Sequence, residues 1–241
     1  MPPIRKGDGT PVEPKGVSQI RTGDGRILFD GPAIPDPENL HHGYDSTLLD
    51  LSDNDSVSPW SDFDDNVGPN DLTAGDAPTY REDQLNGDPI VDFDTSNYLE
   101  TNFNDVSPPY TRYIVFKYDD AGSFNNYVLD GGSDNEALFR ADGDDDWQIG
   151  GLRGGSPDTD WHIASLRYDT DGYIRIDGSV VASGDTSPNS LSGITMGSRF
   201  GGSNNADISV RYHLGYSVGH DANTAESVEE FLSNQTGVAL S

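Results

Sequence analysis

The sequence predicts an all-β protein, built as a two-sheet sandwich with a short N-terminal β-arm and one C-terminal helix. Three observations support this prediction. From His41 onward, short apolar runs recur about every ten residues, a spacing typical of sandwiches and jelly rolls. Gly, Asn, Asp and Pro separate these runs, and these are the residues that turns require. A single segment near the C-terminus has helical periodicity instead.

The strands are expected where β-branched and aromatic residues concentrate between turn residues. Two tight turns are expected at Asp169-Thr170-Asp171-Gly172 and at Asp177-Gly178, because glycine supplies the positive φ that a hairpin needs. The clearest strands are predicted at Arg112–Tyr118, Asn126–Asp130, Glu136–Ala141, Trp161–Tyr168, Tyr173–Asp177 and Asp207–Tyr216.

The helix is expected to begin after Asn223, which forms a capping box with Glu226. Four residues at helical spacing then make one apolar stripe, and Gly237 follows shortly beyond the expected end. The stripe consists of Ala225, Val228, Phe231 and Leu232. We therefore expect this helix to pack against the sandwich along that stripe.

Charge is the strongest feature of the composition. The chain has 42 acidic and 14 basic residues, which gives a formal net charge of −28. Such a charge opposes compaction by self-repulsion, and concentrated salt removes this cost because the screening length falls to about 3 Å near 1 M. We therefore expect a protein adapted to molar salt. The alternative is an acidic protein from an environment of ordinary salt.

Composition also excludes several classes of partner and site. The chain has no basic face to release the counterions of a nucleic acid. No segment is long and apolar enough to cross a bilayer, and the N-terminus has no apolar core of a secretion signal. The absence of cysteine excludes disulfides and thiolate metal sites. We expect neither nucleic-acid binding nor membrane insertion.

The N-terminal segment differs in charge from the rest of the chain. Through Arg26 it has five basic and three acidic residues, and the unit Ile4-Arg5-Lys6-Gly7-Asp8-Gly9 returns as Ile20-Arg21-Thr22-Gly23-Asp24-Gly25. An isolated hairpin is marginal in water, so we interpret residues 1–30 as a β-arm for anchoring or assembly. The residues expected to act in this arm are Ile4, Arg5, Lys6, Ile20, Arg21 and Arg26. The alternative is a strand that pads the chain's own sandwich.

Three prolines, Pro32, Pro35 and Pro37, follow the arm. Proline-rich segments are semi-rigid spacers. We therefore divide the chain into an arm at 1–30, a linker at 31–40 and a sandwich at 41–241.

From about His41 to the end, the order of short motifs resembles a known family. The motifs are Trp60-Ser61-Asp62, Tyr80, Asn86-Gly87, Val91-Asp92-Phe93-Asp94 with Tyr98-Leu99, Trp161-His162, Tyr168-Asp169, Asp177-Gly178, Met196-Gly197-Ser198-Arg199, and the C-terminal Ala225-Glu226 through Gly237-Val238. Their order and spacing are similar to those of concanavalin A-like domains of the laminin-G type. The resemblance implies a concanavalin A-like jelly-roll sandwich.

The arm carries a second resemblance. Its Arg-Lys-Gly-Asp-Gly-Thr opening at residues 5–10 resembles openings that precede such sandwiches in structural proteins of tailed viruses of halophilic archaea. This implies a tail fibre, a tail adaptor or a capsid-surface turret. One fold hosts many functions, so the sandwich itself does not decide between them.

Clusters of aspartate are candidate cation sites, because hard cations such as Ca²⁺ and Mg²⁺ take oxygen ligands. The densest cluster provides Asp142, Asp144, Asp145 and Asp146, and a second provides Asp62, Asp64, Asp65 and Asp71. We expect no required cofactor, with a structural Ca²⁺ or Mg²⁺ at one cluster as an open alternative to a solvated acidic surface. His41-His42 in the linker could touch a metal, whereas His162 is expected to be structural.

Sugar binding needs an aromatic platform surrounded by polar groups. Trp147 follows the acidic loop, and the loops of a sandwich gather at its two ends. The candidate glycan site therefore combines Trp147, Tyr127, Asn125, Asn126 and Arg153. The alternative is that Trp147 and Tyr127 belong to the core or an interface.

These observations favour a virion structural protein that displays a lectin-like domain for attachment to host-surface glycans. Multivalent display raises avidity, so we expect a homo-oligomer with other virion proteins as partners, located on the virion surface in high salt. A secreted or cell-surface carbohydrate-binding module of a halophilic archaeon is the first alternative. A glycoside hydrolase is the second, but the Glu-x-Asp-x-x-Glu strand motif of the glucanases that share this fold is missing, so we do not expect an enzyme.

Overall fold

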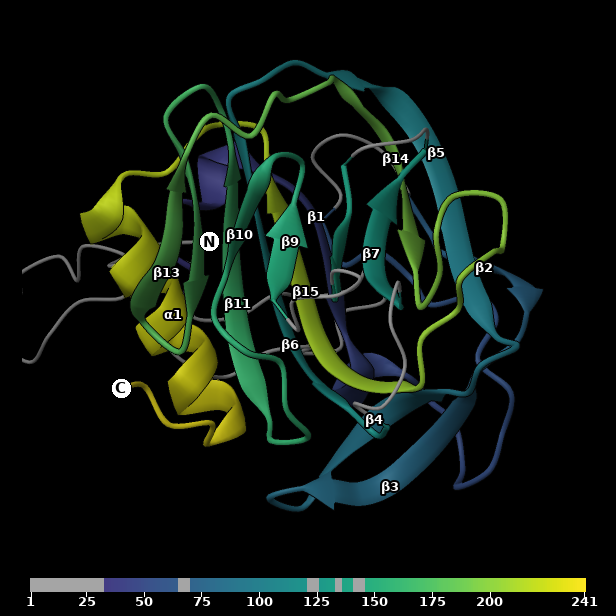
Figure 1. Ribbon diagram of the computed structural model, residues 1–241. Helices are drawn as coiled ribbons and strands as arrows, with labels where there is room; N and C mark the ends of the chain where they lie inside the picture. The colour runs from purple at the N-terminus through teal and green to yellow at the C-terminus, as the bar shows by residue number, and fades with distance from the viewer. Residues whose placement is uncertain (1–32, 65–69, 121–125, 133–135, 141–145) are drawn as a thin grey trace, which may run out of the picture.

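The computed structural model describes residues 33–64, 70–120, 126–132, 136–140 and 146–241. In this part of the chain the strands form two antiparallel sheets that pack face to face, with one helix outside them (Figure 1). The predicted all-β sandwich with a C-terminal helix is confirmed.

The first sheet has eight strands among the described residues and is called here the helix-side sheet. Its order is β13-β12-β11-β6-β15-β4-β3, and β1 pairs with the second half of β15. The strands are β1 (Leu40–Asp45), β3 (Thr79–Leu85), β4 (Asp88–Phe93), β6 (Tyr110–Tyr118), β11 (His162–Tyr168), β12 (Gly172–Ile176), β13 (Ser179–Gly184) and β15 (Ile208–Tyr216).

The second sheet, called here the front sheet, has seven strands in the described part of the chain, in the order β10-β9-β8-β7-β14-β5-β2. The strands are β2 (Thr73–Asp76), β5 (Tyr98–Val106), β7 (Tyr127–Gly131), β8 (Leu138–Arg140), β9 (Trp147–Ile149), β10 (Leu152–Gly154) and β14 (Leu191–Met196). Because β14 pairs with both β5 and β7, the segments just after β14 lie close to both of these strands.

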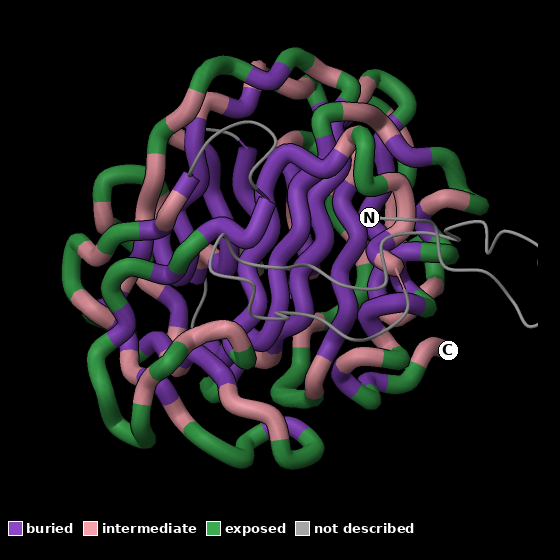
Figure 2. The backbone as a smooth tube through the Cα atoms, turned by 180° about the vertical axis from the view of Figure 1, so that it is seen from behind, coloured by how far each residue is buried: buried purple, intermediate pink, exposed green. Residues whose placement is uncertain are grey.

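Alternation along the strands separates two apolar clusters. On β6, Tyr110, Ile114 and Phe116 point into the space between the sheets, whereas Tyr113 and Val115 point to the opposite face. This follows from the period-2 geometry of a strand. The buried strands consequently form the centre of the molecule, and exposed residues are confined largely to the loops at its periphery (Figure 2).

The helix α1 (Ala222–Thr236) covers the outer face of the helix-side sheet. The predicted stripe of Ala225, Val228, Phe231 and Leu232 is buried. The predicted cap is wrong by two residues: Asp221, not Asn223, accepts a hydrogen bond from the backbone N–H of Thr224. A carboxylate at this position also interacts favourably with the positive end of the helix dipole.

A buried ion pair fixes the helix to the sheet. Arg175 on β12 donates two hydrogen bonds to the Glu229 carboxylate of α1, at 2.8 and 2.9 Å. Both side chains are almost completely buried. The bidentate geometry satisfies both charges, which is the condition under which a buried pair is tolerated.

The two predicted turns are confirmed. Asp169 to Asp171 connect β11 with β12, and Asp177-Gly178 connects β12 with β13. At the second turn φ is 51° at Asp177 and 86° at Gly178, which is the left-handed conformation that a tight hairpin requires.

Residues 33–40 pack on the sandwich, where the sequence predicted a linker. Ile34 is buried in the cluster beneath the helix, the Tyr216 hydroxyl donates a hydrogen bond to the Pro35 carbonyl, and Pro37–Asn39 form a short 3₁₀ turn. The arm residues Ile4, Arg5, Lys6, Ile20, Arg21 and Arg26 lie outside the described residues. In the described ranges, no helix has the length and apolar character needed to span a membrane.

Candidate functional site

Trp147 is a core residue, so its predicted role as an exposed sugar platform is wrong. Its side chain is 1% exposed. Its ring stacks on Tyr118 with centroids 5.7 Å apart and meets Phe116 edge-on at 5.5 Å. Both partners lie on β6 of the opposite sheet. The alternation of β9 points Trp147 into the sandwich, and a buried ring has no free face for a ligand.

The other predicted glycan residues are dispersed. Asn126 is buried, and its backbone carbonyl accepts a hydrogen bond from the Tyr118 hydroxyl. Tyr127 is half-buried at the start of β7, and Arg153 is exposed on β10 at the far end of the front sheet. Asn125 lies outside the described residues. The structure therefore does not bring Arg153 together with Tyr127.

The densest acidic cluster lies mostly outside the described residues, which include Asp146 but not Asp142, Asp144 or Asp145. In the second cluster, both carboxylate oxygens of Asp62 accept hydrogen bonds: one from the backbone N–H groups of Gly43 and Asp64, the other from the Asn70 amide. Burial raises the pKa of Asp62 to about 6. Among the described residues, no group of three or more His, Asp or Glu side chains is arranged to hold a metal ion.

His162 is structural, as predicted. Its ring bridges two carboxylates, with Nδ1 2.7 Å from Asp177 and Nε2 3.0 Å from Asp158. Burial lowers the pKa of His162, but the hydrogen bonds and charges of these carboxylates outweigh burial and raise it overall. The bridge ties the segment before β11 to the turn after β12.

His41 and His42 belong to β1 and are buried, which corrects their predicted place in a linker. The His42 ring stacks on His213 of β15 with centroids 5.1 Å apart. Burial lowers the pKa of both rings well below the usual value. They are therefore neutral core side chains at neutral pH.

A buried arginine lies beside these histidines between the two sheets. The Arg112 guanidinium donates hydrogen bonds to the backbone carbonyls of Glu136 and Asp130, at 3.0 and 3.2 Å. Burial raises the pKa of the Glu136 side chain to about 7. Because all three side chains are completely buried, this cluster joins the sheets and offers no surface to a ligand.

The loop at 198–205 between β14 and β15, called here the Phe200 loop, carries an exposed aromatic side chain. Figure 1 shows it in yellow-green beside β5 and β2, at the edge of the front sheet. The loop folds back on itself: Arg199 and Ser203 form a β-bridge, and Gly201 and Gly202 have φ of 79° and 76°. The Phe200 side chain at its tip is 41% exposed.

Three contacts hold the Phe200 loop in one conformation. The Asp130 carboxylate on β7 accepts a hydrogen bond from the backbone N–H of Phe200 at 3.0 Å, and Asp130 itself is completely buried. The buried Ser198 hydroxyl lies 2.8 Å from the Asn205 side chain and 2.9 Å from the Ser203 carbonyl. Since the loop is ordered by these contacts, a ligand would bind to it with little loss of conformational entropy.

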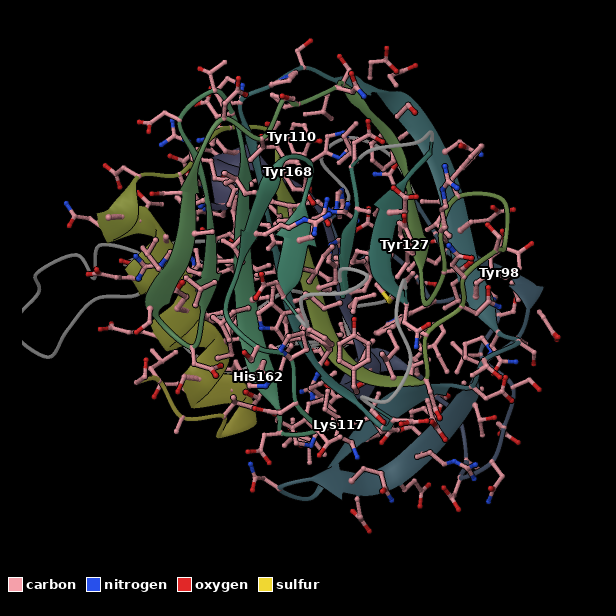
Figure 3. The ribbon with its side chains drawn as sticks, in the orientation of Figure 1. Tyr98, Tyr110, Lys117, Tyr127, His162 and Tyr168 are labelled. Carbon is pink, nitrogen blue, oxygen red and sulfur yellow. The ribbon has the colours of Figure 1, made fainter. Side chains whose placement is uncertain are left out.

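Two tyrosines flank the loop. Tyr127 forms a β-bridge with Asn205, and the Tyr98 ring packs so closely on Gly202 that a Cβ atom there would lie 2.7 Å from it. Tyr98 and Tyr127 come from β5 and β7 and lie on the same side of the molecule in Figure 3. The surface therefore combines an exposed aromatic ring with two half-buried phenols and the amides of Asn204 and Asn205.

Aromatic rings bordered by amides and hydroxyls suit ligands that have an apolar face and a polar edge. Of the predicted site residues, Tyr127 belongs to this surface. Phe200 was missed, although its position in the glycine- and asparagine-rich run Phe200-Gly201-Gly202-Ser203-Asn204-Asn205 is a signal that could have found it. An aromatic residue in such a run has no strand to bury it.

Comparisons with known proteins identify the fold. No protein family matches the sequence. No curated protein matches it either. The structure is similar to a Trypanosoma rangeli sialidase solved in complex with sialic acid, with a TM-score of 0.58 and 17% identity over 86% of this chain and 34% of that chain. The chain thus spans about a third of the length of the sialidase chain.

Two other solved structures are similar over more of their own length. Domain 4 of AbnA, an extracellular arabinanase from Geobacillus stearothermophilus, was solved in complex with arabinotriose. It matches with a TM-score of 0.54 and 12% identity over 74% of this chain and 100% of that domain. The binding domain of a botulinum neurotoxin of serotype D/C matches with a TM-score of 0.53 and 9% identity over 81% of this chain and 53% of that chain. At these identities the likeness establishes the fold, and this chain has the two-sheet sandwich of the concanavalin A-like lectins.

Proposed function

We propose that this chain is a carbohydrate-binding domain and that the Phe200 loop, with Tyr98 and Tyr127, contacts the sugar. The observation that carries the proposal is the likeness to AbnA domain 4, because the whole of that domain matches and it was solved with arabinotriose bound. The exposed ring of Phe200 supplies an apolar platform, and the neighbouring amides supply hydrogen-bonding groups for hydroxyls.

The charge of the chain favours a neutral glycan. A net charge of −28 repels polyanionic ligands over several ångströms in dilute salt. Glu100 on β5 pairs with Thr195 on β14, beside the Phe200 loop, and adds a local acidic group. We therefore expect neutral oligosaccharides to bind better than sialylated ones.

A glycan array followed by calorimetry tests the proposal. We expect wild-type protein to retain neutral oligosaccharides, and Phe200→Ala to weaken that binding about tenfold, as the loss of one stacking contact of about 1.4 kcal/mol would do. Val180→Ala is the matched control, because Val180 on β13 is the other large exposed apolar residue of the described chain, at 54% exposure. If no array glycan binds, or if the two variants bind alike, the proposed surface is wrong.

A finer proposal concerns the setting in which the domain acts. We propose that it is displayed on the virion of a salt-adapted virus for attachment to the host surface, as a homo-oligomer held by its N-terminal arm. The net charge, the basic segment through Arg26 and its repeated unit support this. Deleting residues 1–30 should leave a folded, soluble sandwich that no longer enters particles. A truncated protein that still assembles normally would mean that the arm only pads the sandwich of its own chain.

A further inference from the structure

Two buried carboxylic acids share one cation beneath the Phe200 loop. Asp130 on β7, Glu136 just before β8 and Arg112 on β6 are all completely buried. The Arg112 guanidinium donates to the backbone carbonyls of the two acids. Its Nε–H and both carboxylate oxygens of Glu136 are buried without a hydrogen bond of ordinary geometry among the described residues. Arg112 therefore does not form an ion pair with Glu136 in this arrangement.

A buried carboxylate without such a partner favours its neutral form. Burial is the main reason that the pKa of Glu136 is raised to about 7, and the charge of Asp130 adds to it. Arg112 and the nearby Asn189 amide favour the charged form, but they oppose the first two effects only in part. Glu136 thus gains or loses its proton close to neutral pH.

The other titratable groups around this cluster keep one charge state in that range. Burial raises the pKa of Tyr110 and Tyr168, whose rings stack on each other (Figure 3), so both phenols stay neutral. Burial lowers the pKa of His42 and His213, so both rings stay neutral as well. These neighbours therefore do not mask a change of charge at Glu136.

A short series of contacts connects Glu136 to the Phe200 loop. Glu136 Oε2 lies against Gly131, where a Cβ atom would come within 2.2 Å of it. The backbone N–H of Gly131 donates a hydrogen bond of 2.9 Å to one oxygen of the Asp130 carboxylate. The other oxygen accepts the backbone N–H of Phe200 at 3.0 Å. One residue, Gly131, therefore separates the Glu136 carboxylate from the group that holds the loop.

The elements beside Asp130 add one charge of each sign. Asp130 pairs with Thr195 on β14, which pairs in turn with Glu100 on β5. Arg199 precedes Phe200 in the loop. The balance of charge around Asp130 is therefore close, and a second carboxylate charge at Glu136 would change it.

We propose that Glu136 makes the Phe200 loop sensitive to pH. While Glu136 is protonated, Arg112 stays on the two backbone carbonyls and Asp130 holds the loop. Once Glu136 loses its proton, its charge attracts the guanidinium away from the Asp130 carbonyl and repels the Asp130 carboxylate. Asp130 then releases the backbone N–H of Phe200, and the loop loses its fixed conformation.

This inference rests on the proposed function and adds a regulation of the same surface. A loop without a fixed conformation must be ordered when a ligand binds, and this ordering reduces affinity. Sugar binding should therefore be stronger below neutral pH than above it.

A pH titration of the Phe200 amide by NMR tests the proposal on the full chain, at constant molar salt and without any sugar. Because the amide proton loses its carboxylate acceptor, its resonance should shift with a midpoint near pH 7 in the wild type. Glu136→Gln has a neutral side chain of nearly the same shape, so this shift should disappear. A wild-type resonance that stays constant from pH 5.5 to 8.5 would overturn the proposal, whether or not the variant folds.

Asp62→Asn is the matched control for the titration. Burial also raises the pKa of Asp62, to about 6, but its carboxylate accepts hydrogen bonds from Gly43 and Asp64 and not from the loop. The Phe200 shift should therefore persist in Asp62→Asn. A shift that persists in Glu136→Gln, or that disappears in Asp62→Asn, would assign the pH response to another group and refute the role of Glu136.

Calorimetry with arabinotriose at pH 5.5 and 8.5 separates this inference from the proposed function. Wild-type binding should be about fivefold weaker at pH 8.5, since the loop must then be ordered on binding, and Glu136→Gln should bind alike at both pH values. Equal wild-type binding at both pH values would sink the inference and leave the proposed function standing. A Phe200 resonance that titrates as expected, without binding of arabinotriose at either pH, would support the pH response and count against the proposed function.

Discussion

Replacing Trp147 by alanine separates a core role from a binding role. The ring is 1% exposed, stacks on Tyr118 and meets Phe116 edge-on. Truncating a buried tryptophan to alanine costs about 3–5 kcal/mol, because burial is lost and a cavity remains. The two aromatic contacts contribute about 0.5–1.5 kcal/mol each beyond their area. We therefore expect Trp147→Ala to lower the free energy of unfolding by about 3–5 kcal/mol or slightly more.

A loss of this size is large compared with the stability of a domain, which is typically about 5–15 kcal/mol. For a protein of this length, about 1 kcal/mol shifts the melting temperature by roughly 2–4 °C, so a fall of roughly 6–20 °C is expected. Urea unfolding followed by far-ultraviolet circular dichroism measures the change at constant salt. Tryptophan fluorescence is unsuitable because the variant itself removes a fluorophore.

A matched variant sharpens this test. Trp161 is only half-buried, and its ring receives the Lys117 ammonium at 5.8 Å from its centroid. Because such an exposed cation–π contact is worth about 0.5–1 kcal/mol, Trp161→Ala should destabilise the protein much less. If the free energy of unfolding of Trp147→Ala lies within about 1 kcal/mol of the wild-type value and the variant loses sugar binding, Trp147 is a sugar platform. The reasoning from its burial then fails.

Two further predictions concern pH and salt. The carboxylates of Asp177 and Asp158 raise the folded-state pKa of His162 above its ordinary 6.5, so the stability from the bridge is full below pH 6.5 and is lost as pH rises through the folded pKa. His162→Gln should therefore cost more stability at pH 5.5 than at pH 8.5 in thermal melts, and an equal cost at both pH values would contradict the bridge. The net charge of −28 predicts that dialysis from molar salt to about 0.1 M unfolds or disassembles the protein. At 0.1 M the Debye length is about 10 Å, so the acidic groups repel one another over a longer distance. An unchanged circular dichroism spectrum and melting point would refute the expected salt adaptation.

The fold could be predicted from the sequence because its signals are local. Alternation and turn residues identified the segments around β6, β11, β12 and β15 and the two hairpin turns, with boundaries shifted by one or two residues. The apolar stripe of α1 identified its buried face. The helix cap was misplaced because Asp221 and Asn223 both have capping side chains, and only the backbone conformation selects between them.

The candidate site was harder to predict because it depends on contacts between distant segments. Tyr98 and Tyr127 reach the Phe200 loop because β14 pairs with both β5 and β7. The local sequence does not indicate that pairing. The histidines of β1 show the same difficulty. A pair of adjacent histidines near prolines indicates a loop, yet His42 is stacked on His213, which lies 171 residues later in the chain.

The sequence by itself determined the sandwich, its helix and the acidic surface, because strand alternation, helical spacing and net charge are properties of neighbouring residues or of the whole composition. Only the tertiary structure decided which aromatic rings face solvent. Trp147 and Phe200 both lie next to polar, glycine-containing runs of sequence. One is stacked against the opposite sheet, while the other extends from a loop anchored by the buried Asp130. Exposure depends on what packs against a side chain from elsewhere in the chain, and the local sequence does not contain that information.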